Sequence, residues 1–488
     1  MLREIEMSST KLIPGMHIHI IGAGGSGMSA IARVLLGRGY VVSGSDLQSN
    51  ALTAALEEAG ATLYIGHEAG TVNGVDLVVV SSAVPADNPE IVAANLQSIP
   101  VIKRADLLGE LMLGTIGIAV AGSHGKTTTA GMIAHILVEA DLDPTVIVGG
   151  VLPEIGSNGR YGDGPYFVVE ADEYDFMFLG LRPEVSVITN VEHDHPDLFS
   201  TEEDYRAAFR QFANLLPDNG RLIVCADDPG AARLLSELEL SGVEVTTYGL
   251  NGTVTSGPQV GEKVHFRAVD FQPNQAGGTD FVVAQGGQTI GLARLRVPGL
   301  HNVRNALAAI VVGLDLQIEF GQICKALATF GGVQRRFQVL GEVGGVTVID
   351  DYAHHPTEIR ATLAAARQRY PGRRLWAVWQ PHTFSRTRLL AEKFAGSFDD
   401  ADRVIALDIY RSRESDDLGV ATGTVLDMMH HADARYIPQP DEAVAYLLEL
   451  VRPDDVILTL SAGDGNLVGK NLLEALEKYV GDKGNLGA

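Results

Sequence analysis

At the centre of the sequence stands Thr115-Ile-Gly-Ile-Ala-Val-Ala-Gly122-Ser-His-Gly-Lys-Thr-Thr-Thr129, an apolar run that leads into a glycine-rich turn with one lysine. The pattern predicts a buried strand, a phosphate-binding loop and a helix. Lys126 is suited to the outer phosphates of a nucleotide, and the Thr127 hydroxyl to a magnesium ion. The usual loop has four residues between its glycines, whereas Gly122 and Gly125 enclose two. We therefore expect a nucleotide site built by a variant of that loop.

Acidic residues follow two further apolar runs. Glu170-Ala-Asp-Glu173 comes after residues 166–169, and Asn190-Val-Glu-His-Asp-His195 comes after residues 185–189. Ligands of parallel sheets bind at the carboxyl ends of the strands, so these clusters are expected beside the phosphate loop. Magnesium prefers oxygen ligands, which the carboxylates of these clusters supply. For His195, metal ligation and a hydrogen-bonding role are equally open.

A second glycine-rich turn lies near the N-terminus. Gly22-Ala-Gly-Gly-Ser-Gly27 follows the apolar residues 17–21, and Asp46 stands 46 − 22 = 24 positions after Gly22. Such a turn lets backbone amides approach a diphosphate at the start of a helix. The pattern indicates a ligand with a diphosphate, and taken alone it also fits an NAD-dependent oxidoreductase.

Strands and helices alternate along the chain, which predicts α/β domains with mainly parallel sheets. We expect three: residues 1–113, residues 114–332 with an antiparallel insertion over 243–297, and residues 333–488. The outer two are expected to be Rossmann-like and the central one a phosphate-loop-type ATPase domain. Gly331-Gly332 is the expected hinge between the last two domains, because paired glycines leave the backbone free to rotate.

Polar motifs gather in the second half of the chain. His301-Asn-Val-Arg-Asn305 opens a helix, with Asn302 as its expected N-cap, and two arginines occur in Gln334-Arg-Arg-Phe337. Asp350-Asp-Tyr-Ala-His-His-Pro356 and Gln380-Pro-His-Thr-Phe-Ser-Arg-Thr387 each follow an apolar strand. Two such loops at successive strand ends predict a ligand-binding rim. A zinc site made by its histidines is disfavoured, because neither thiolates nor a Glu-x-x-His spacing accompany them.

Composition narrows the range of partners. Hydrophobic residues make up 46% and charged residues 20% of the 488, which is typical of a globular protein. The net charge of −24 argues against nucleic acid or an anionic membrane as the main partner. Residues 1–6 lack the pattern of a signal peptide, and the two cysteines, Cys225 and Cys324, predict no disulfide framework. A cytoplasmic protein, monomeric or homodimeric, is expected.

In combination and in this order, the motifs Gly-Ser-His-Gly-Lys-Thr-Thr, Glu-Ala-Asp-Glu, Asp-His, His-Asn-x-x-Asn, Arg-Arg-Phe and Asp-Asp-Tyr-x-His-His-Pro resemble the Mur ligase family. The match covers essentially the whole chain. The Gly-x-Gly-Gly-Ser-Gly-Met-Ser turn and the Gln-Pro-His-x-x-Ser-Arg-Thr loop are similar to the branch that adds L-alanine to UDP-N-acetylmuramate. The resemblance implies ATP and Mg²⁺ as cofactors, an acyl-phosphate intermediate, and release of ADP and phosphate in peptidoglycan precursor synthesis.

The resemblance also implies roles for single residues, with the sugar nucleotide in the first domain, ATP in the second and alanine in the third. The implied UDP-sugar contacts are Gly22, Gly24, Gly25, Ser26 and Gly27 at the diphosphate, and Asp46 and His67 near the uridine. The implied contacts to the ATP phosphates come from the phosphate loop: Gly122, Ser123, His124, Gly125, Lys126, Thr127 and Thr128. The implied metal ligands are Thr127, Glu170 and His195. His301 and Asn305 are implied at the adenine, Arg336 at a phosphate and Asp351 at the ribose. The implied alanine rim comprises Tyr352, His355, His382 and Arg386. A neutral His355 or His382 is the candidate for the base that accepts the proton from the amine of alanine.

One departure from the family pattern is informative. Many relatives carry a lysine after the Asp-His motif that becomes carbamylated, whereas residues 195–217 contain no lysine and only Arg206 and Arg210 as basic residues. The absence fits the alanine-adding branch. Three alternatives stay open at this point: the recycling ligase that attaches a preformed peptide to the same sugar, an NAD-dependent oxidoreductase, and a nucleotide-gated binding protein without catalysis.

Overall fold

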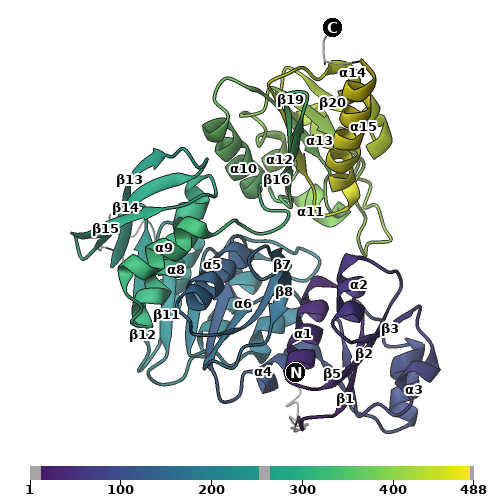
Figure 1. The fold of residues 1–488 in the computed structure, drawn as a ribbon, viewed down its shortest axis with the longest axis vertical. Helices are drawn as coiled ribbons and strands as arrows, with labels where there is room; N and C mark the ends of the chain where they lie inside the picture. The colour runs from purple at the N-terminus through teal and green to yellow at the C-terminus, as the bar shows by residue number, and fades with distance from the viewer. Residues whose placement is uncertain (1–11, 252–263, 484–488) are drawn as a thin grey trace.

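The computed structural model describes residues 12–251 and 264–483 and folds them around three β-sheets (Figure 1). Buried apolar residues line both faces of the parallel part of each sheet, as expected where helices cover both sides. The prediction of three α/β units is therefore confirmed. Residues 1–6, to which the signal-peptide argument referred, lie outside the described residues. No helix in the described ranges is both long and apolar enough to cross a membrane.

The first unit, at the lower right of Figure 1, is a parallel five-stranded sheet in the order β3-β2-β1-β4-β5. Its strands are β1 (His17–Ile21), β2 (Val41–Asp46), β3 (Thr62–Ile65), β4 (Leu77–Val80) and β5 (Val101–Lys103). Its helices are α1 (Ser26–Gly37), α2 (Ala51–Glu58), α3 (Pro89–Leu96) and α4 (Arg104–Leu111), with the 3₁₀ helix η1 (Ala69–Val72). The glycine turn joins β1 to α1, as the sequence predicts.

The second unit is a ten-stranded sheet in the order β15-β14-β13-β12-β11-β10-β6-β9-β7-β8. Its strands are β6 (Ile116–Ala121), β7 (Thr145–Leu152), β8 (Ser157–Arg160), β9 (Tyr166–Glu170), β10 (Val185–Ile188), β11 (Arg221–Cys225), β12 (Glu244–Gly249), β13 (Phe266–Pro273), β14 (Thr279–Gln285) and β15 (Gln288–Arg294). Its helices are α5 (Lys126–Glu139), α6 (Glu202–Ala213), α7 (Pro229–Glu237), α8 (Leu300–Asp315), α9 (Phe320–Thr329) and the 3₁₀ helix η2 (Tyr174–Gly180).

The antiparallel insertion is confirmed for β13–β15 and corrected for β12, which pairs in parallel with β11. The prediction for residues 252–263 lies outside the described residues. A second correction concerns α8, because its N-cap is Gly299 and not Asn302. The Asn302 side chain instead donates to the Pro298 carbonyl at 2.7 Å, one turn earlier.

The third unit, at the top of Figure 1, is a sheet in the order β16-β17-β21-β18-β19-β20, parallel except for the β16–β17 pair. Its strands are β16 (Gln338–Val343), β17 (Val346–Asp351), β18 (Arg374–Trp379), β19 (Arg403–Ala406), β20 (Ala434–Tyr436) and β21 (Asp455–Leu460). Its helices are α10 (Pro356–Arg369), α11 (Phe384–Leu389), α12 (Ala391–Ala395), α13 (Thr422–Met428), α14 (Pro440–Leu450), α15 (Leu467–Lys483) and the 3₁₀ helix η3 (Asp464–Asn466).

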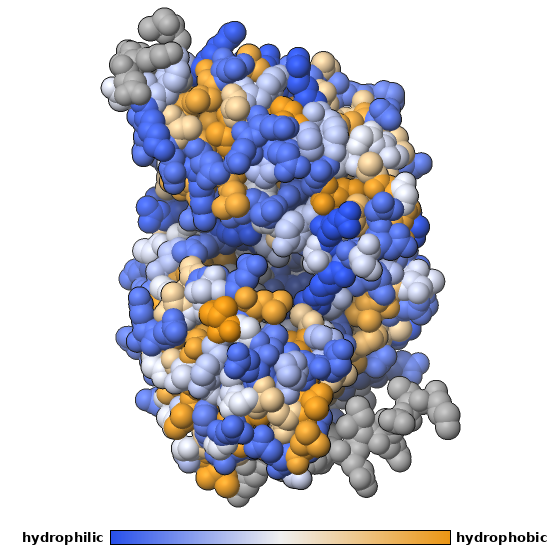
Figure 2. All heavy atoms as spheres, turned by 90° about the vertical axis from the view of Figure 1, so that its right-hand side faces the viewer, coloured by the Kyte–Doolittle hydropathy of each residue, from blue (hydrophilic) through white to orange (hydrophobic). Residues whose placement is uncertain are grey.

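The order of the strands brings the polar motifs to one place. Strands β10, β6 and β9 are neighbours, so the Asn190 segment, the phosphate loop and Glu170 emerge side by side at their carboxyl ends. The third unit rests against this edge through α10 and α11. On the face shown in Figure 2, a recess bordered largely by hydrophilic residues separates the upper and lower parts of the molecule.

Candidate functional site

The phosphate loop lies between β6 and α5 and needs both of its glycines. Gly122 has φ 140° and Gly125 has φ 80°, and both values disfavour a residue with a side chain. A Cβ at Gly125 would approach the amide oxygen of Asn305 to 2.6 Å. No described side chain caps the first turn of α5. Its leading amides are therefore available to an anion, which agrees with the predicted phosphate site.

Lys126 is held by a carboxylate that the sequence reasoning passed over. Its Nζ donates to Glu173 Oε2 at 2.8 Å and Oε1 at 3.1 Å, and to the Gly122 carbonyl at 2.6 Å. Burial alone would lower the pKa of Lys126, but Glu173 and the nearby Asp172 and Glu170 outweigh it and raise the pKa. The ammonium group is thus charged and fixed beside the loop. Glu173 stands in the predicted acidic motif, but its pairing with Lys126 carries no local sequence signal.

The predicted metal ligands form two groups. Glu170 accepts from the Gly149 amide at 2.6 Å, and the Thr127 hydroxyl lies close enough to oppose the rise that burial causes in the pKa of Glu170. His195 Nε2 instead lies 3.8 Å from Glu173 Oε1. The hydroxyl and carboxylate oxygens of Thr127 and Glu170 are the donors that magnesium prefers, so these residues fit the ion. His195 stays a prediction, because it lies with a different carboxylate.

Replacing Glu170 with alanine should raise the magnesium concentration needed for half-maximal activity by about tenfold or more. His195→Ala should act in the same direction if its imidazole is a ligand. Magnesium titrations of ATP-dependent turnover measure both effects, with the exposed Glu184→Ala in the same unit as control. An unchanged magnesium dependence in either variant removes that residue from the ligand set.

His124 joins the second unit to the third. Its Nε2 lies 3.2 Å from Glu192 and its Nδ1 3.3 Å from Glu358 of α10. Burial opposes a charge on the ring, but the two carboxylates raise the pKa of His124 to about 10. In the described residues, His124, Glu192 and His355 form a group whose ligand atoms lie within 4.8 Å of one another. Because both nitrogens of His124 already face carboxylates, an imidazolium bridge explains this group without a metal.

A cavity of about 330 Å³ opens between the second and third units. It is lined by predicted nucleotide contacts from both: His124, Gly125, Thr127, Thr128, His301, Asn305, Arg336 and Asp351. Residues that the sequence reasoning missed complete the wall, among them Asp227, Tyr248, Phe337 and Glu358. The cavity therefore unites the loop at one end with the predicted adenine and ribose contacts. Ser123 does not line it, because its hydroxyl donates to the Glu192 carbonyl at 2.7 Å.

The buried Asp351 ends β17 with both carboxylate oxygens engaged. They accept from the amides of Phe337 and Ala353 at 2.8 and 2.7 Å, and burial raises the pKa of Asp351 to about 6. Tyr352, the next residue, has two arginines beside its ring, with the guanidinium carbons of Arg335 and Arg336 each 5.1 Å from its ring centre. These contacts fix the start of the predicted rim.

The two histidines expected as bases have their acceptor nitrogens occupied. His355 is fully buried as the N-cap of α10, where its Nδ1 accepts from the Thr357 amide. His382 Nδ1 faces the Arg386 guanidinium at 3.0 Å. Burial lowers the pKa of His355 to about 3 and of His382 to about 2, so both rings are neutral at pH 7. A neutral imidazole that accepts at Nδ1 carries its proton on Nε2, and this geometry therefore disfavours the base role.

Arg386 of the third unit makes a buried ion pair with Asp194 of the second unit. Its Nε donates to Asp194 Oδ1 at 2.8 Å, and both side chains are 4% exposed. Burial opposes ionisation of Asp194, but Arg386 lowers its pKa well below the ordinary value. Arg386, which is predicted at the alanine rim, is thus anchored to the segment that follows β10 and carries His195.

The glycine turn of the first unit is also held by hydrogen bonds. Asp46 Oδ2 accepts from the Gly24 amide at 2.8 Å, and the Gly25 amide donates to the Gly22 carbonyl at 3.2 Å. His67 Nδ1 lies 2.7 Å from Glu90, a fully buried carboxylate that the sequence reasoning missed. Asp46 and His67 are thereby placed on the same unit as the turn, although no contact tests their roles toward uridine.

The two arginines in the segment that lacks a lysine face away from this site. Arg206 pairs with Glu203 and with Glu237 at 3.1 Å, and Arg210 pairs with the same two carboxylates. They form a cluster between α6 and α7. Neither replaces a modified lysine at the phosphate loop.

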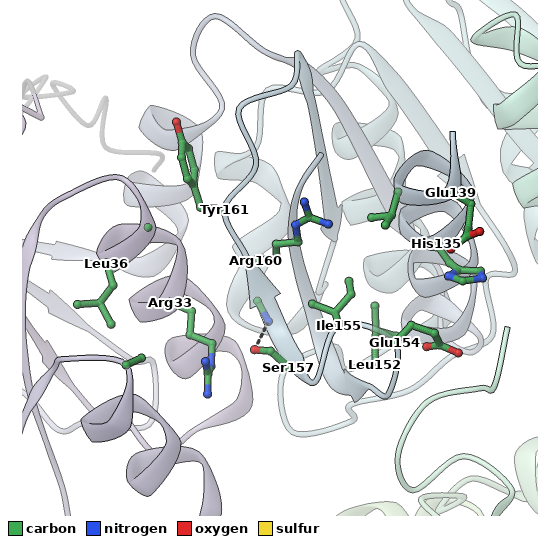
Figure 3. A pocket seen from close by; sticks show the side chains of 14 residues that line it. Arg33, Leu36, His135, Glu139, Leu152, Glu154, Ile155, Ser157, Arg160 and Tyr161 are labelled. Carbon is green, nitrogen blue, oxygen red and sulfur yellow. Dashed lines mark hydrogen bonds between the residues drawn. The ribbon is translucent and has the colours of Figure 1, made fainter. Parts of the chain in front are cut away.

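A second cavity, of about 630 Å³, is lined by residues of α1, α5 and the β7–β8 hairpin (Figure 3). Arg33 and Leu36 line it from the first unit, and His135 and Glu139 from α5. None of the predicted contacts lines this cavity. The predicted contacts are instead at the strand ends and around the smaller cavity beside the phosphate loop, which is the candidate site.

Three family models match consecutive parts of the chain. The model of the Mur ligase family catalytic domain matches residues 17–115, that of the Mur ligase middle domain residues 120–313, and that of the Mur ligase glutamate ligase domain residues 335–463. Together they span all three sheets.

Similar proteins extend the match to nearly full length. A UDP-N-acetylmuramate–L-alanine ligase from Salinibacter ruber is 45% identical over 95% of this chain and 96% of its own. The crystal structure of UDP-N-acetylmuramate-alanine ligase from Thermotoga maritima superposes with a TM-score of 0.79 and 29% identity, over 95% of this chain and all of that one. A murein peptide ligase from Psychrobacter arcticus is also similar, with a TM-score of 0.71 and 25% identity over 95% and 99%.

Proposed function

This chain belongs to the Mur ligase family, and we propose that it joins L-alanine to the lactyl carboxylate of UDP-N-acetylmuramate while ATP is cleaved to ADP and phosphate. The observation that carries this proposal is the 45% identity, over 95% of the chain, to a ligase named for that reaction. The phosphate loop with the paired Lys126 and the adjoining cavity supply the nucleotide site that the reaction needs. The reaction belongs to peptidoglycan precursor synthesis.

The three units divide the substrates in this proposal. The sugar nucleotide is bound by the glycine turn of residues 1–113, ATP by residues 114–332 and alanine by residues 333–488. The division is supported by the position of the cavity, whose walls come from the second and third units and so bring ATP to their boundary. The rim of Tyr352, His382 and Arg386 lies on the third unit beside that boundary.

The chemical step begins with an anionic carboxylate, which is a poor electrophile. Transfer of the γ-phosphoryl group onto it creates a leaving group that the amine of alanine displaces. Lys126, held charged by Glu173, stabilises the negative charge that develops on the transferring group. Thr127 and Glu170 would hold magnesium, which would supply further positive charge for the phosphate oxygens. The geometry supports no assignment of the base for the amine.

An amino-acid panel tests the proposal against the recycling ligase. Phosphate release is measured with ATP, magnesium and UDP-N-acetylmuramate, adding each amino acid in turn and then a preformed murein tripeptide. L-Alanine should give the highest kcat/KM. A tripeptide that surpasses L-alanine would identify the recycling reaction instead. Phosphate release in the absence of any acceptor would contradict both ligase assignments. So would the absence of phosphate release with every acceptor tested.

The intermediate should be an acyl phosphate and not an acyl adenylate. Thr127 lines the cavity, Lys126 adjoins it in the phosphate loop, and both residues act on the carboxyl group of Glu170. This grouping suits the outer phosphates of ATP. With ¹⁸O in the lactyl carboxylate, one labelled oxygen should appear in inorganic phosphate, and ADP should be the nucleotide product. Label in AMP, with pyrophosphate released, would overturn this route while leaving amide formation in place.

The proposal places the enzyme in the cytoplasm, where ATP and nucleotide sugars are found, as a monomer or homodimer. Its net charge of −24 gives no reason to expect nucleic acid or an anionic membrane as a partner.

A further inference from the structure

Arg104 bridges the first and second units. It is the first residue of α4, and its Nη2 donates to Asp172 Oδ2 at 2.6 Å, within the acidic motif that follows β9. The Arg104 side chain is 19% exposed and that of Asp172 33%, so solvent reaches the pair. Burial opposes the charge on Asp172, but Arg104 lowers its pKa, which keeps the pair ionised.

The other end of the guanidinium lies against the glycine turn. A Cβ added at Gly27 would collide with Arg104 Nη1. The last glycine of the turn therefore leaves room for this particular side chain. Gly27 is in the first turn of α1, which no described side chain caps. Arg104 thus adds a positive charge to the place where the proposed diphosphate meets the helix.

Arg104 also lies between the proposed site of the sugar nucleotide and the proposed site of ATP. On one side is the glycine turn, and on the other is Asp172, whose charge also acts on Lys126. A guanidinium has five N–H donors in a fixed plane, and in the described residues only one of them has a protein acceptor. Asp172 fixes the orientation of that plane. The remaining donors are available to anionic oxygens.

We propose that Arg104 is a substrate-binding residue that grips the anionic oxygens of the sugar nucleotide where the first unit meets the second. This inference rests on the proposed function for the identity of the substrate. Two groups of that substrate present the required oxygens, namely the diphosphate and the lactyl carboxylate. Both offer the planar or forked acceptor geometry that arginine binds with two hydrogen bonds.

Lys103 is a matched control beside it. Its Nζ pairs with Asp175 at 3.0 Å, so it also carries a positive charge across the two units. Its side chain is 60% exposed, and no added Cβ in the glycine turn would meet it. A purely structural bridge between the units would make Lys103→Ala and Arg104→Ala behave alike.

The test is direct titration of the full-length enzyme with UDP-N-acetylmuramate, UDP-N-acetylglucosamine and UDP. Arg104→Ala should weaken UDP-N-acetylmuramate binding roughly 10- to 100-fold, as expected for a lost charge-assisted contact, and Lys103→Ala by less than about twofold. Arg104→Lys should recover only part of the loss, because a point charge replaces a fork. Thermal unfolding of each variant separates misfolding from lost binding.

The three ligands distinguish the two sources of the oxygens. Equal weakening for all three assigns Arg104 to the diphosphate, whereas weakening confined to UDP-N-acetylmuramate assigns it to the lactyl carboxylate. Arg104→Ala with the affinity of Lys103→Ala for every ligand would overturn the proposal. Because titration needs no turnover, a wild-type enzyme that binds these ligands without ligating alanine would contradict the proposed function and leave the Arg104 test intact.

Discussion

Lys126→Ala should lower kcat by roughly a thousandfold or more while the KM for UDP-N-acetylmuramate changes little. The ammonium group acts on charge that develops during phosphoryl transfer, so its loss raises the barrier more than it weakens binding. Steady-state kinetics with coupled detection of ADP measure both constants. Lys393→Ala is a suitable control, because Lys393 is an exposed lysine of the third unit, 3.8 Å from Glu192.

The same substitution should also destabilise the protein, for a reason unrelated to catalysis. Glu173 is 1% exposed, and without Lys126 its carboxylate keeps the Tyr205 hydroxyl at 3.0 Å and the more distant His195 Nε2 at 3.8 Å, but no lysine or arginine among the described residues. Leaving a buried charge unpaired costs about 3–5 kcal/mol. The double variant Lys126→Ala/Glu173→Gln removes that charge.

The double variant separates the two effects. It should regain most of the lost thermal stability and stay as slow as Lys126→Ala. A double variant that regained turnover together with stability would mean that the single variant was slow because it was poorly folded. Near-normal kcat in the single variant would remove Lys126 from the phosphate site altogether.

The sequence was sufficient to predict which motifs lie together at the carboxyl edge of the sheet in the second unit. Glu170 and Asn190 were expected beside Gly122 because each follows an apolar strand, and parallel strands end at one edge. The structure confirms this, with β9 and β10 on either side of β6. Strand periodicity and helix signals are local, so one sequence suffices to read them.

The side-chain pairings were not predictable in the same way. His124 and Glu358 are 234 residues apart, and nothing near either residue indicates the other. His355 was expected at the ligand-binding rim, and the structure places it as the N-cap of α10 with Glu358 as its capping-box partner. The usual capping box begins with serine or threonine, so the histidine gave no such signal. The β7–β8 hairpin was missed because its strands contain Gly149, Gly150 and Gly159, which are poor strand formers.

Arg386→Ala should have the second large effect, on both stability and alanine-dependent turnover. The variant leaves Asp194 buried and without its guanidinium partner, which costs about 3–5 kcal/mol. It also releases α11, and with it the predicted alanine rim, from the segment that carries His195. We expect kcat/KM for L-alanine to fall by roughly 100-fold or more, because small displacements of a positioned group have effects of this size. The exposed neighbour Arg388→Ala should leave both quantities near wild type.

A double-mutant cycle with Asp194→Asn shows whether the pairing itself matters. If Arg386 acts through Asp194, the double variant should be no less stable than Arg386→Ala, because the unpaired charge has been removed. If Arg386 also contacts alanine, turnover should stay low in the double variant although stability returns. Additive losses in both stability and kcat/KM would show that the two residues act independently. The buried ion pair would then not be what holds α11 against the segment that follows β10.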